Sequence, residues 1–411
     1  AERHGVLLTT PYGRGVTEFR GIGENDVFCV LAEIEKKYYV DRDRVSLTGL
    51  SMGGTASYEM ALNHPGFFSA VAPIGAAHSF HWLATNGEHT PFWCIGGEFD
   101  RDFVKNGGLE CAEKMIGMGF DCSLDILKTR EHSDFAPELF ESVVEWLLKQ
   151  RLVRHPKEYS SSSLLPMSGR SYWTSLDAIE TPGTVGTLHA RIASSTSIHI
   201  ETDNVSAFSV LPDPELTDLT QPITVQVDGV CTPKGAVGVA QEIRLVRSEG
   251  GWISRVLPRR ELSLTSYRNN PVANASAEIG MEGVEAPLAL WIADAMRVAT
   301  GADVAMYNRR YYRGLPIPQG VVDEVDLLQC SRPTNQELAI VELTGHAIVR
   351  ILEDNIKVPE TLRHSFPLTF GARDLEFLIQ PSGFSYTFDS AGPYGERVIQ
   401  CDIDESKLYR V

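Results

Sequence analysis

A serine between two glycines, at the junction of an expected strand and an expected helix, constrains this chain more than any other feature. The segment Gly49-Leu50-Ser51-Met52-Gly53 follows the apolar run Val45–Thr48, which is typical of a buried strand. A helical pattern begins directly after it. A turn of this kind strains the backbone of the serine and leaves its hydroxyl group accessible. The segment therefore indicates a sheet that presents a reactive group at the end of a strand.

Apolar runs and amphipathic stretches alternate along residues 1–150, the pattern of a mostly parallel sheet covered by helices on both faces. The runs expected to be strands are 6–10, 45–48, 70–74, 92–95 and 123–127. The stretches expected to be helices are 27–39, 54–63, 108–117 and 136–148. We therefore predict an α/β fold for this part of the chain.

A serine hydroxyl is a weak nucleophile until a base removes its proton, so Ser51 needs a histidine that a carboxylate orients. Asp100 lies in the loop after the expected strand at 92–95, and Asp102 and Glu98 in the same loop are rivals for this role. His132 follows the last expected strand. The order serine, carboxylate, histidine predicts Ser51 as nucleophile, Asp100 as acid and His132 as base.

The helix expected after Ser51 points its first backbone NH groups toward the reacting oxygen, so the NH of Met52 is a candidate oxyanion donor. The segments 41–54, DRDRVSLTGLSMGG, and 63–70, NHPGFFSA, together with Asp100, give residues 1–150 a clear likeness. They resemble the α/β-hydrolase superfamily, specifically the prolyl-oligopeptidase, dienelactone-hydrolase and polyhydroxybutyrate-depolymerase-like esterase group. The resemblance implies acyl transfer from an ester or a peptide to Ser51, followed by hydrolysis by water.

One part of that family pattern is missing from the sequence. Family members have strands ahead of the one that matches Val6–Thr10, and the loop after their third strand supplies a second oxyanion NH. Here only Ala1–Gly5 precede Val6. Two explanations are open: the chain was cut from a longer protein, which we favour, or it is a hydrolase that lacks part of its sheet. The loss of one oxyanion donor lowers turnover by about 100- to 1000-fold, so reduced activity is expected.

The remainder of the chain is expected to form two further parts. A polar stretch containing Ser160–Ser163 suits a linker at 151–168. Short runs in which apolar and polar residues alternate are separated by turns of Gly, Pro and Asp. This pattern predicts a small antiparallel, β-rich unit at 169–268. Helical patterns at 287–300 and 345–355 predict a separate α+β domain at 269–411.

This last domain carries a second resemblance, spread over residues 270–411. It rests on Asn308 with Arg313 five residues later and on the segments 293–296 (ADAM), 300–305 (TGADVA), 333–335 (PTN) and 343–345 (LTG). The domain is similar to the C-terminal domain of the 5′-nucleotidase family. In that family the domain binds the nucleotide, with an arginine at the position of Arg313 and an aromatic residue in the region of Phe377 stacking on the base. The resemblance implies Asn308, Arg313 and Phe377 as ligand-binding residues.

The chain also departs from the nucleotidase pattern. Residues 309–312, with the sequence RRYY, stand where the family has glycines, so we expect a remodelled pocket. Neither Asp-x-His nor Gly-Asn-His-Asp occurs in the sequence, so the metallophosphatase domain is absent. Cleavage of phosphate esters by that two-metal mechanism is therefore not expected.

Composition limits the partners of the chain. The net charge of −17, from 37 basic and 54 acidic residues, disfavours nucleic acid and anionic membranes. No apolar run of 18 residues occurs and the seven cysteines form no C-x-x-C pair, so no transmembrane segment, metal or cofactor is expected. The expected partners are a small-molecule or peptide substrate with an ester or amide bond, and a nucleotide or sugar ligand. The resemblances imply a secreted or periplasmic protein.

Three functions follow from these patterns. The first is a serine hydrolase that acts through an acyl-enzyme on Ser51 and carries an accessory nucleotidase-like domain. The second is a binding protein, in which the last domain captures a nucleotide or sugar and the hydrolase part is degenerate. The third, a role in nucleotide catabolism related to that of 5′-nucleotidases, is disfavoured by the missing metal ligands.

Overall fold

The chain forms two compact units, Ala1–Tyr267 and Arg268–Val411, which are described separately. The computed structural model describes residues 2–411 except for several internal ranges. These ranges are 13–18, 20–21, 77–80, 101–102, 104–107, 133, 165–169, 182, 234–236, 261–270, 309–314, 324–325, 328–329, 331–337 and 357–377. Among the described residues, no helix combines the length and the apolar content needed to cross a bilayer.

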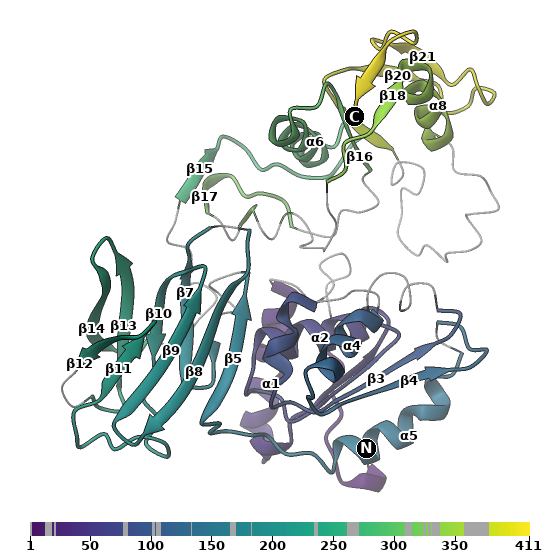
Figure 1. Cartoon of the computed structure of the whole chain (residues 1–411). Helices are drawn as coiled ribbons and strands as arrows, with labels where there is room; N and C mark the ends of the chain where they lie inside the picture. Colours follow the sequence, from purple (N-terminus) through teal and green to yellow (C-terminus); the bar gives the residue numbers. More distant parts are fainter. Residues whose placement is uncertain are drawn as a thin grey trace. The chain divides into compact units, whose positions relative to one another are not determined.

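The first part of unit 1 is built on a four-stranded sheet in which every pair of neighbours is parallel (Figure 1). Its strands, in spatial order, are β1 (Leu47–Leu50), β2 (Val71–Ile74), β3 (Phe92–Gly97) and β4 (Cys122–Leu127). The helices of this part are α1 (Ile22–Lys37), α2 (Met52–Asn63), α4 (Gly108–Gly117) and α5 (Ala136–Leu147). One apolar cluster joins α2 and α4 to the sheet through Tyr58 and Met115, and another joins α5 through Val143. The sheet is thus covered on both faces, which confirms the predicted α/β fold.

The strand expected at Val6–Thr10 is not formed. These residues have no regular structure, and Leu7 and Leu8 are more than half exposed. An apolar run becomes a strand only when a neighbouring strand satisfies its backbone groups and covers its side chains. Among the described strands, β1 lies at the edge of the sheet and pairs only with β2.

The second part of unit 1 is a β-sandwich of two five-stranded sheets. One sheet has the order β14-β13-β10-β7-β6 and the other has the order β12-β11-β9-β8-β5. The strands are β5 (Glu158–Ser163), β6 (Arg170–Ser171), β7 (Thr174–Ile179), β8 (Gly186–Ser194), β9 (Ser197–Asp203), β10 (Val205–Val210), β11 (Thr224–Val227), β12 (Val230–Pro233), β13 (Gln241–Ser248) and β14 (Gly251–Pro258). Residues from both sheets, such as Leu176, Phe208, Ile198 and Val225, form one apolar core.

The sandwich differs from the small antiparallel unit that the sequence predicts. Strands β9 and β11 pair in parallel. Strand β10, which lies between them in the chain, belongs to the other sheet, so β11 returns beside β9 in the same direction.

The expected linker at 151–168 is also wrong in part, because residues 158–163 form strand β5, which pairs with β8. Ser161, Ser162 and Ser163 are buried, although serine runs are typical of exposed linkers. The 3₁₀ helix η4 (His81–Gly87) supplies polar partners to this strand. The strand thus depends on contacts with a distant part of the chain.

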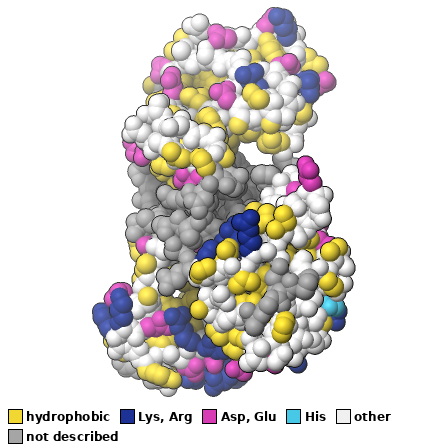
Figure 2. Space-filling view, turned by 90° about the vertical axis from the view of Figure 1, so that its left-hand side faces the viewer, with side chains coloured by type: hydrophobic (Ala, Val, Ile, Leu, Met, Phe, Trp, Pro, Cys, Tyr) yellow, Lys and Arg dark blue, Asp and Glu magenta, His cyan; other side chains and the backbone are white. Residues whose placement is uncertain are grey.

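The negative net charge does not exclude local groups of basic residues. Figure 2 shows Lys and Arg side chains in small groups among apolar and acidic ones on the face of unit 1 that carries the sandwich. Within the sandwich, Arg244 of β13 and Arg255 of β14 are directly paired across the two strands.

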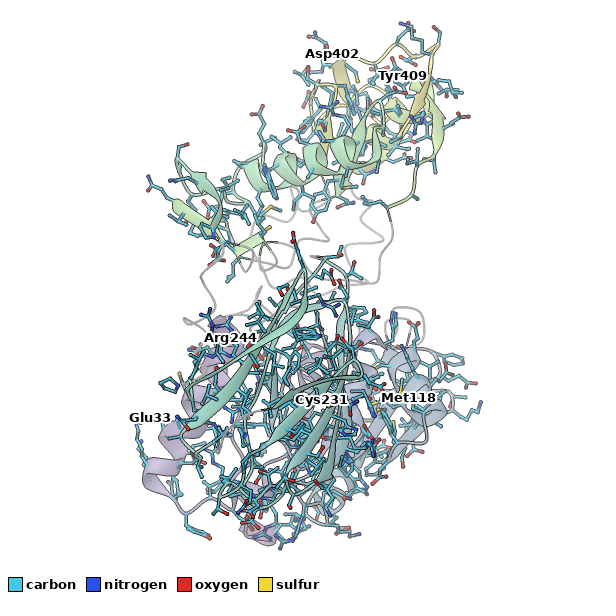
Figure 3. All side chains as sticks on the ribbon, turned by 60° about the vertical axis from the view of Figure 1, so that its left-hand side comes forward. Glu33, Met118, Cys231, Arg244, Asp402 and Tyr409 are labelled. Carbon is cyan, nitrogen blue, oxygen red and sulfur yellow. The ribbon has the colours of Figure 1, made fainter. Side chains whose placement is uncertain are left out.

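Unit 2 contains two long helices and four two-stranded sheets among its described residues. Its elements are β15 (Pro271–Ala275), α6 (Pro287–Thr300), β16 (Ala305–Asn308), β17 (Gly320–Asp323), β18 (Glu342–Thr344), α8 (Gly345–Ile356), β19 (Ile379–Ser382), β20 (Tyr386–Phe388), β21 (Val398–Cys401) and β22 (Leu408–Arg410). Tyr409 of β22, labelled in Figure 3, packs on a cluster that includes Val304 and Ile348. This α+β arrangement agrees with the predicted fold class.

Candidate active site

Ser51 occupies the sharp turn between β1 and α2 that the sequence predicts. Its backbone angles are φ 56° and ψ −116°, outside the regions that residues with a side chain favour. Its NH donates to the carbonyl oxygen of Ile74 on the neighbouring strand at 2.9 Å. Strain held by the surrounding structure is common at functional sites, because it places one side chain in an otherwise unfavourable position.

Two glycines allow this turn to form, and only one of them, Gly49, belongs to the pair Gly49 and Gly53 that flanks the serine; the other is Gly54. A Cβ atom on Gly49 would lie 2.5 Å from the carbonyl carbon of Gly53, and one on Gly54 would lie 2.4 Å from the carbonyl oxygen of Ile74. A Cβ atom on Gly53 would meet nothing within 4 Å. Gly49 and Gly54 therefore permit the close approach of strand and helix.

The structure brings Ser51, His132 and Asp100 together in one hydrogen-bonded row. The Nε2 atom of His132 lies 2.7 Å from the Oγ atom of Ser51, and its Nδ1 atom lies 2.8 Å from the Oδ2 atom of Asp100. The Asp100 side chain is 1% exposed and the His132 side chain 36% exposed. A buried carboxylate, a half-buried imidazole and a strained serine form the geometry that nucleophilic acyl transfer requires.

Asp100 is held by its own loop. Its Oδ1 atom accepts a hydrogen bond from the NH of Phe103 at 3.1 Å, which leaves Oδ2 directed at His132. Gly75 lies against this pair, since a Cβ atom there would be 3.2 Å from Asp100 Oδ2 and 3.1 Å from the carbonyl oxygen of His132. The φ angle of Gly75 is 55°, a conformation that favours glycine.

Glu98 and Asp102 are the two other candidates for the carboxylate that orients His132. Glu98 does not contact His132; its carboxylate binds Lys128 and the backbone of Thr129. The hydrogen bond from Thr129, followed by that from Lys128, lowers the pKa of Glu98 below its usual value. Asp102 lies outside the described residues.

Met52, the predicted oxyanion donor, is the first residue of the 12-residue helix α2. The first NH groups of a helix have no acceptor within the helix, and the helix dipole favours negative charge there. An oxyanion formed beside Ser51 would thus lie close to the positive end of α2.

The ligand-binding residues predicted in unit 2 are only partly described. Asn308 ends β16 and pairs with Ile379 of β19. Arg313 and Phe377 lie outside the described residues. Within the described part of the chain, no group of three or more His, Cys, Asp or Glu side chains is arranged to hold a metal ion.

Two family models match the chain. Residues 30–106 match the Esterase family, and residues 270–411 match the family described as 5′-nucleotidase, C-terminal domain. No curated protein matches the chain significantly.

Several solved structures are similar to part of the chain. A thermostable esterase is 20% identical over 32% of this chain and 37% of its own, with a TM-score of 0.29. An S-formylglutathione hydrolase from Agrobacterium tumefaciens is 21% identical over 30% of this chain and 55% of its own, with a TM-score of 0.26. An acylaminoacyl peptidase from Pyrococcus horikoshii is 18% identical over 33% of this chain and 29% of its own, with a TM-score of 0.28. Less than two thirds of the length of each of these three chains is thus covered.

The parallel sheet and the strained serine turn give the first part of the chain an α/β-hydrolase fold, and residues 30–106 of this part match the Esterase family. In the chain, a β-sandwich follows this α/β part and precedes residues 270–411, which match the 5′-nucleotidase C-terminal domain.

Proposed function

We propose that the chain is a serine hydrolase that cleaves an ester or a peptide through an acyl-enzyme on Ser51. The observation that carries this proposal is the row Ser51 Oγ, His132 Nε2 and Nδ1, and Asp100 Oδ2, with contacts of 2.7 and 2.8 Å. In this reaction His132 takes the proton of Ser51 as the hydroxyl attacks the substrate carbonyl, and Asp100 stabilises the imidazolium that forms. His132 then gives the proton to the leaving group, and water repeats the attack on the acyl group.

The NH of Met52 donates to the oxygen that becomes negative in the tetrahedral intermediate. Its place at the start of α2 supports this role, because the partial positive charge of the helix N-terminus stabilises an oxyanion.

The Ser51→Ala variant tests this function with p-nitrophenyl esters as substrates. Loss of hydrolysis in the variant supports an acyl-enzyme on Ser51, whereas hydrolysis at the rate of the unaltered chain contradicts it. Circular dichroism of both proteins controls for folding.

A second proposal concerns residues 269–411, which we propose as an accessory domain that binds a nucleotide or a sugar. Its support is the match to the 5′-nucleotidase C-terminal domain over 270–411, a domain that also leads us to propose a periplasmic or secreted location. Titration calorimetry of the whole chain with AMP, adenosine and glucose tests the binding. Heat of binding with a saturable isotherm for one of them supports the proposal, and its absence for all three contradicts it.

A further inference from the structure

The loops that carry Asp100 and His132 follow neighbouring parallel strands, β3 and β4. The pairing of these strands extends to Gly97 opposite Leu127. Beyond the strands, the NH of Glu98 donates to Leu127 O at 2.9 Å, and the NH of Phe99 donates to Arg130 O, also at 2.9 Å. The two loops therefore remain joined after the sheet has ended.

The side chain of Glu98 adds a second connection between the same loops. Its Oε2 atom accepts a hydrogen bond from the NH of Thr129 at 3.0 Å, and its Oε1 atom accepts one from Lys128 Nζ at 3.0 Å. Thr129 has a φ angle of 59°, which is rare for a β-branched residue. The carboxylate of Glu98 thus stabilises an unfavourable turn three residues before His132.

The space between the loops shows how closely they pack. A Cβ atom on Gly97 would lie 2.3 Å from the carbonyl oxygen of Glu131 and 2.5 Å from that of Arg130. The backbone before Asp100 and the backbone before His132 are thus in contact. A displacement of either loop would change the distance between the two side chains.

We propose that Glu98 is a positioning residue, whose carboxylate holds the His132 loop against the Asp100 loop by accepting the NH of Thr129. This inference rests on the proposed function, because it assigns to Glu98 the alignment of the histidine and the carboxylate that activate Ser51. We call the hydrogen bond between Glu98 and the NH of Thr129 the clamp. Because Glu98 is two residues from Asp100, the clamp acts close to the reacting groups.

The two hydrogen bonds of Glu98 are expected to contribute unequally. Lys128 is 80% exposed, and an ion pair in water contributes little. The bond to the NH of Thr129 acts directly on the turn, and a neutral amide oxygen can accept it as well. The clamp therefore requires an acceptor atom at the end of side chain 98 more than it requires the charge.

Steady-state kinetics and proton NMR of the whole chain test this proposal. The hydrogen-bonded Nδ1 proton of His132 is expected far downfield of the amide signals. In Glu98→Ala we expect kcat for a p-nitrophenyl ester to fall by about 10- to 100-fold with KM nearly unchanged, because small misplacements of reacting groups are costly. The downfield signal should broaden or shift. Glu98→Gln should restore both, and Lys128→Met should change neither.

Glu113→Ala, which removes an exposed glutamate from α4, is the matched control. An unchanged kcat in Glu98→Ala would overturn the proposal. So would a lower kcat with an unaltered downfield signal, since the effect would not then pass through His132. If Glu98→Ala does not fold, Glu98→Asp, which is too short to reach Thr129, carries the same expectations.

The NMR measurement separates this inference from the proposed function. The downfield signal requires only the hydrogen bond between His132 and Asp100, so it reports on the clamp even in a chain without activity. A wild-type chain that does not hydrolyse esters would contradict the proposed function, while the comparison of the signals in wild type and Glu98→Ala would still decide on Glu98.

Discussion

Asn86 of η4 binds both backbone groups of Ser162 in the edge strand β5. Its Nδ2 atom donates to Ser162 O at 2.8 Å, and its Oδ1 atom accepts from Ser162 N at 2.6 Å. The same Nδ2 atom donates to Leu62 O at 2.6 Å, at the end of α2. The amide of Asn86 thus satisfies backbone groups on the outer edge of β5, where no further described strand pairs. It also connects the sandwich to the α/β part of unit 1.

Replacement of this amide should destabilise unit 1. Asn86→Ala leaves the buried backbone groups of Ser162 without partners, and each such group costs about 1–3 kcal/mol. We expect the free energy of unfolding, measured by urea denaturation, to fall by about 2–4 kcal/mol. Thr85→Val removes only the contact between the hydroxyl groups of Thr85 and Ser162 at 2.8 Å, so it should lower the free energy of unfolding by less. Equal stability of Asn86→Ala and wild type would contradict this account of β5.

The glycines of the serine turn should differ in their tolerance of alanine. Gly54→Ala places a methyl group against the backbone of Ile74, and overpacking of this kind costs about 1–3 kcal/mol. Gly53→Ala places a methyl group in open space within α2, where alanine favours the helix by up to about 1 kcal/mol. Thermal unfolding of the two variants checks this difference. A melting temperature of Gly53→Ala as low as that of Gly54→Ala would show that the packing is misassigned.

The role of Asp100 predicts a large effect of a small change. Asp100→Asn preserves the size of the buried side chain but no longer holds the imidazole in the state that accepts the serine proton. We expect kcat for a p-nitrophenyl ester to fall on the order of 10⁴-fold. Asp121→Asn, at an exposed position before β4, is the control and should retain wild-type kcat. A loss of less than tenfold in Asp100→Asn would speak for a different acid.

Unit 2 should lose stability at alkaline pH through Tyr386. Burial raises the pKa of Tyr386 to about 12, while its hydroxyl donates to Ile379 O at 2.9 Å. The unfolded chain ionises this phenol near pH 10, so the stability that it contributes is present below pH 10 and is lost as the pH rises toward 12. Tyr386→Phe should weaken this loss in urea titrations at pH 9 to 12. The same slope in both proteins would contradict a raised pKa of this partly buried phenol.

Local signals in the sequence were sufficient for much of the fold. The helix α6 was predicted at its observed bounds, because Pro287 suits the first turn of a helix and Gly301, with a φ angle of 62°, suits the end of one. The turn at Ser51 was found for the same reason, since its glycines, its strand and its helix are adjacent in the chain.

Features that depend on distant partners could not be predicted from local patterns. Residues 158–163 form a strand because they pair with β8, and Asn86, more than 70 positions earlier, binds the outer edge of this strand at Ser162. Val6–Thr10 has the apolar pattern of a strand but pairs with none of the described strands. Strands β9 and β11 pair in parallel because β10, which lies between them in the chain, belongs to the other sheet. Neither segment carries a sequence signal for this arrangement.

In the candidate site, too, local features could be predicted from the sequence and contacts between distant segments could not. The order of Ser51, Asp100 and His132 at the ends of strands was visible in the sequence, and the structure brings the three side chains within hydrogen-bonding distance. Glu98 was visible only as a rival acid. Its contact with Thr129 depends on the register of β3 and β4, which the sequence does not reveal.

Covalent labelling of Ser51 is the most direct test of the account. A fluorophosphonate reacts with a serine whose proton is removed by a neighbouring base, so the site of attachment, found by peptide mass spectrometry, reports the activated serine. We predict that the whole chain is labelled at Ser51 and that His132→Ala is not labelled. Labelling of neither protein, or labelling of both to the same extent, would contradict an activated serine at the end of β1.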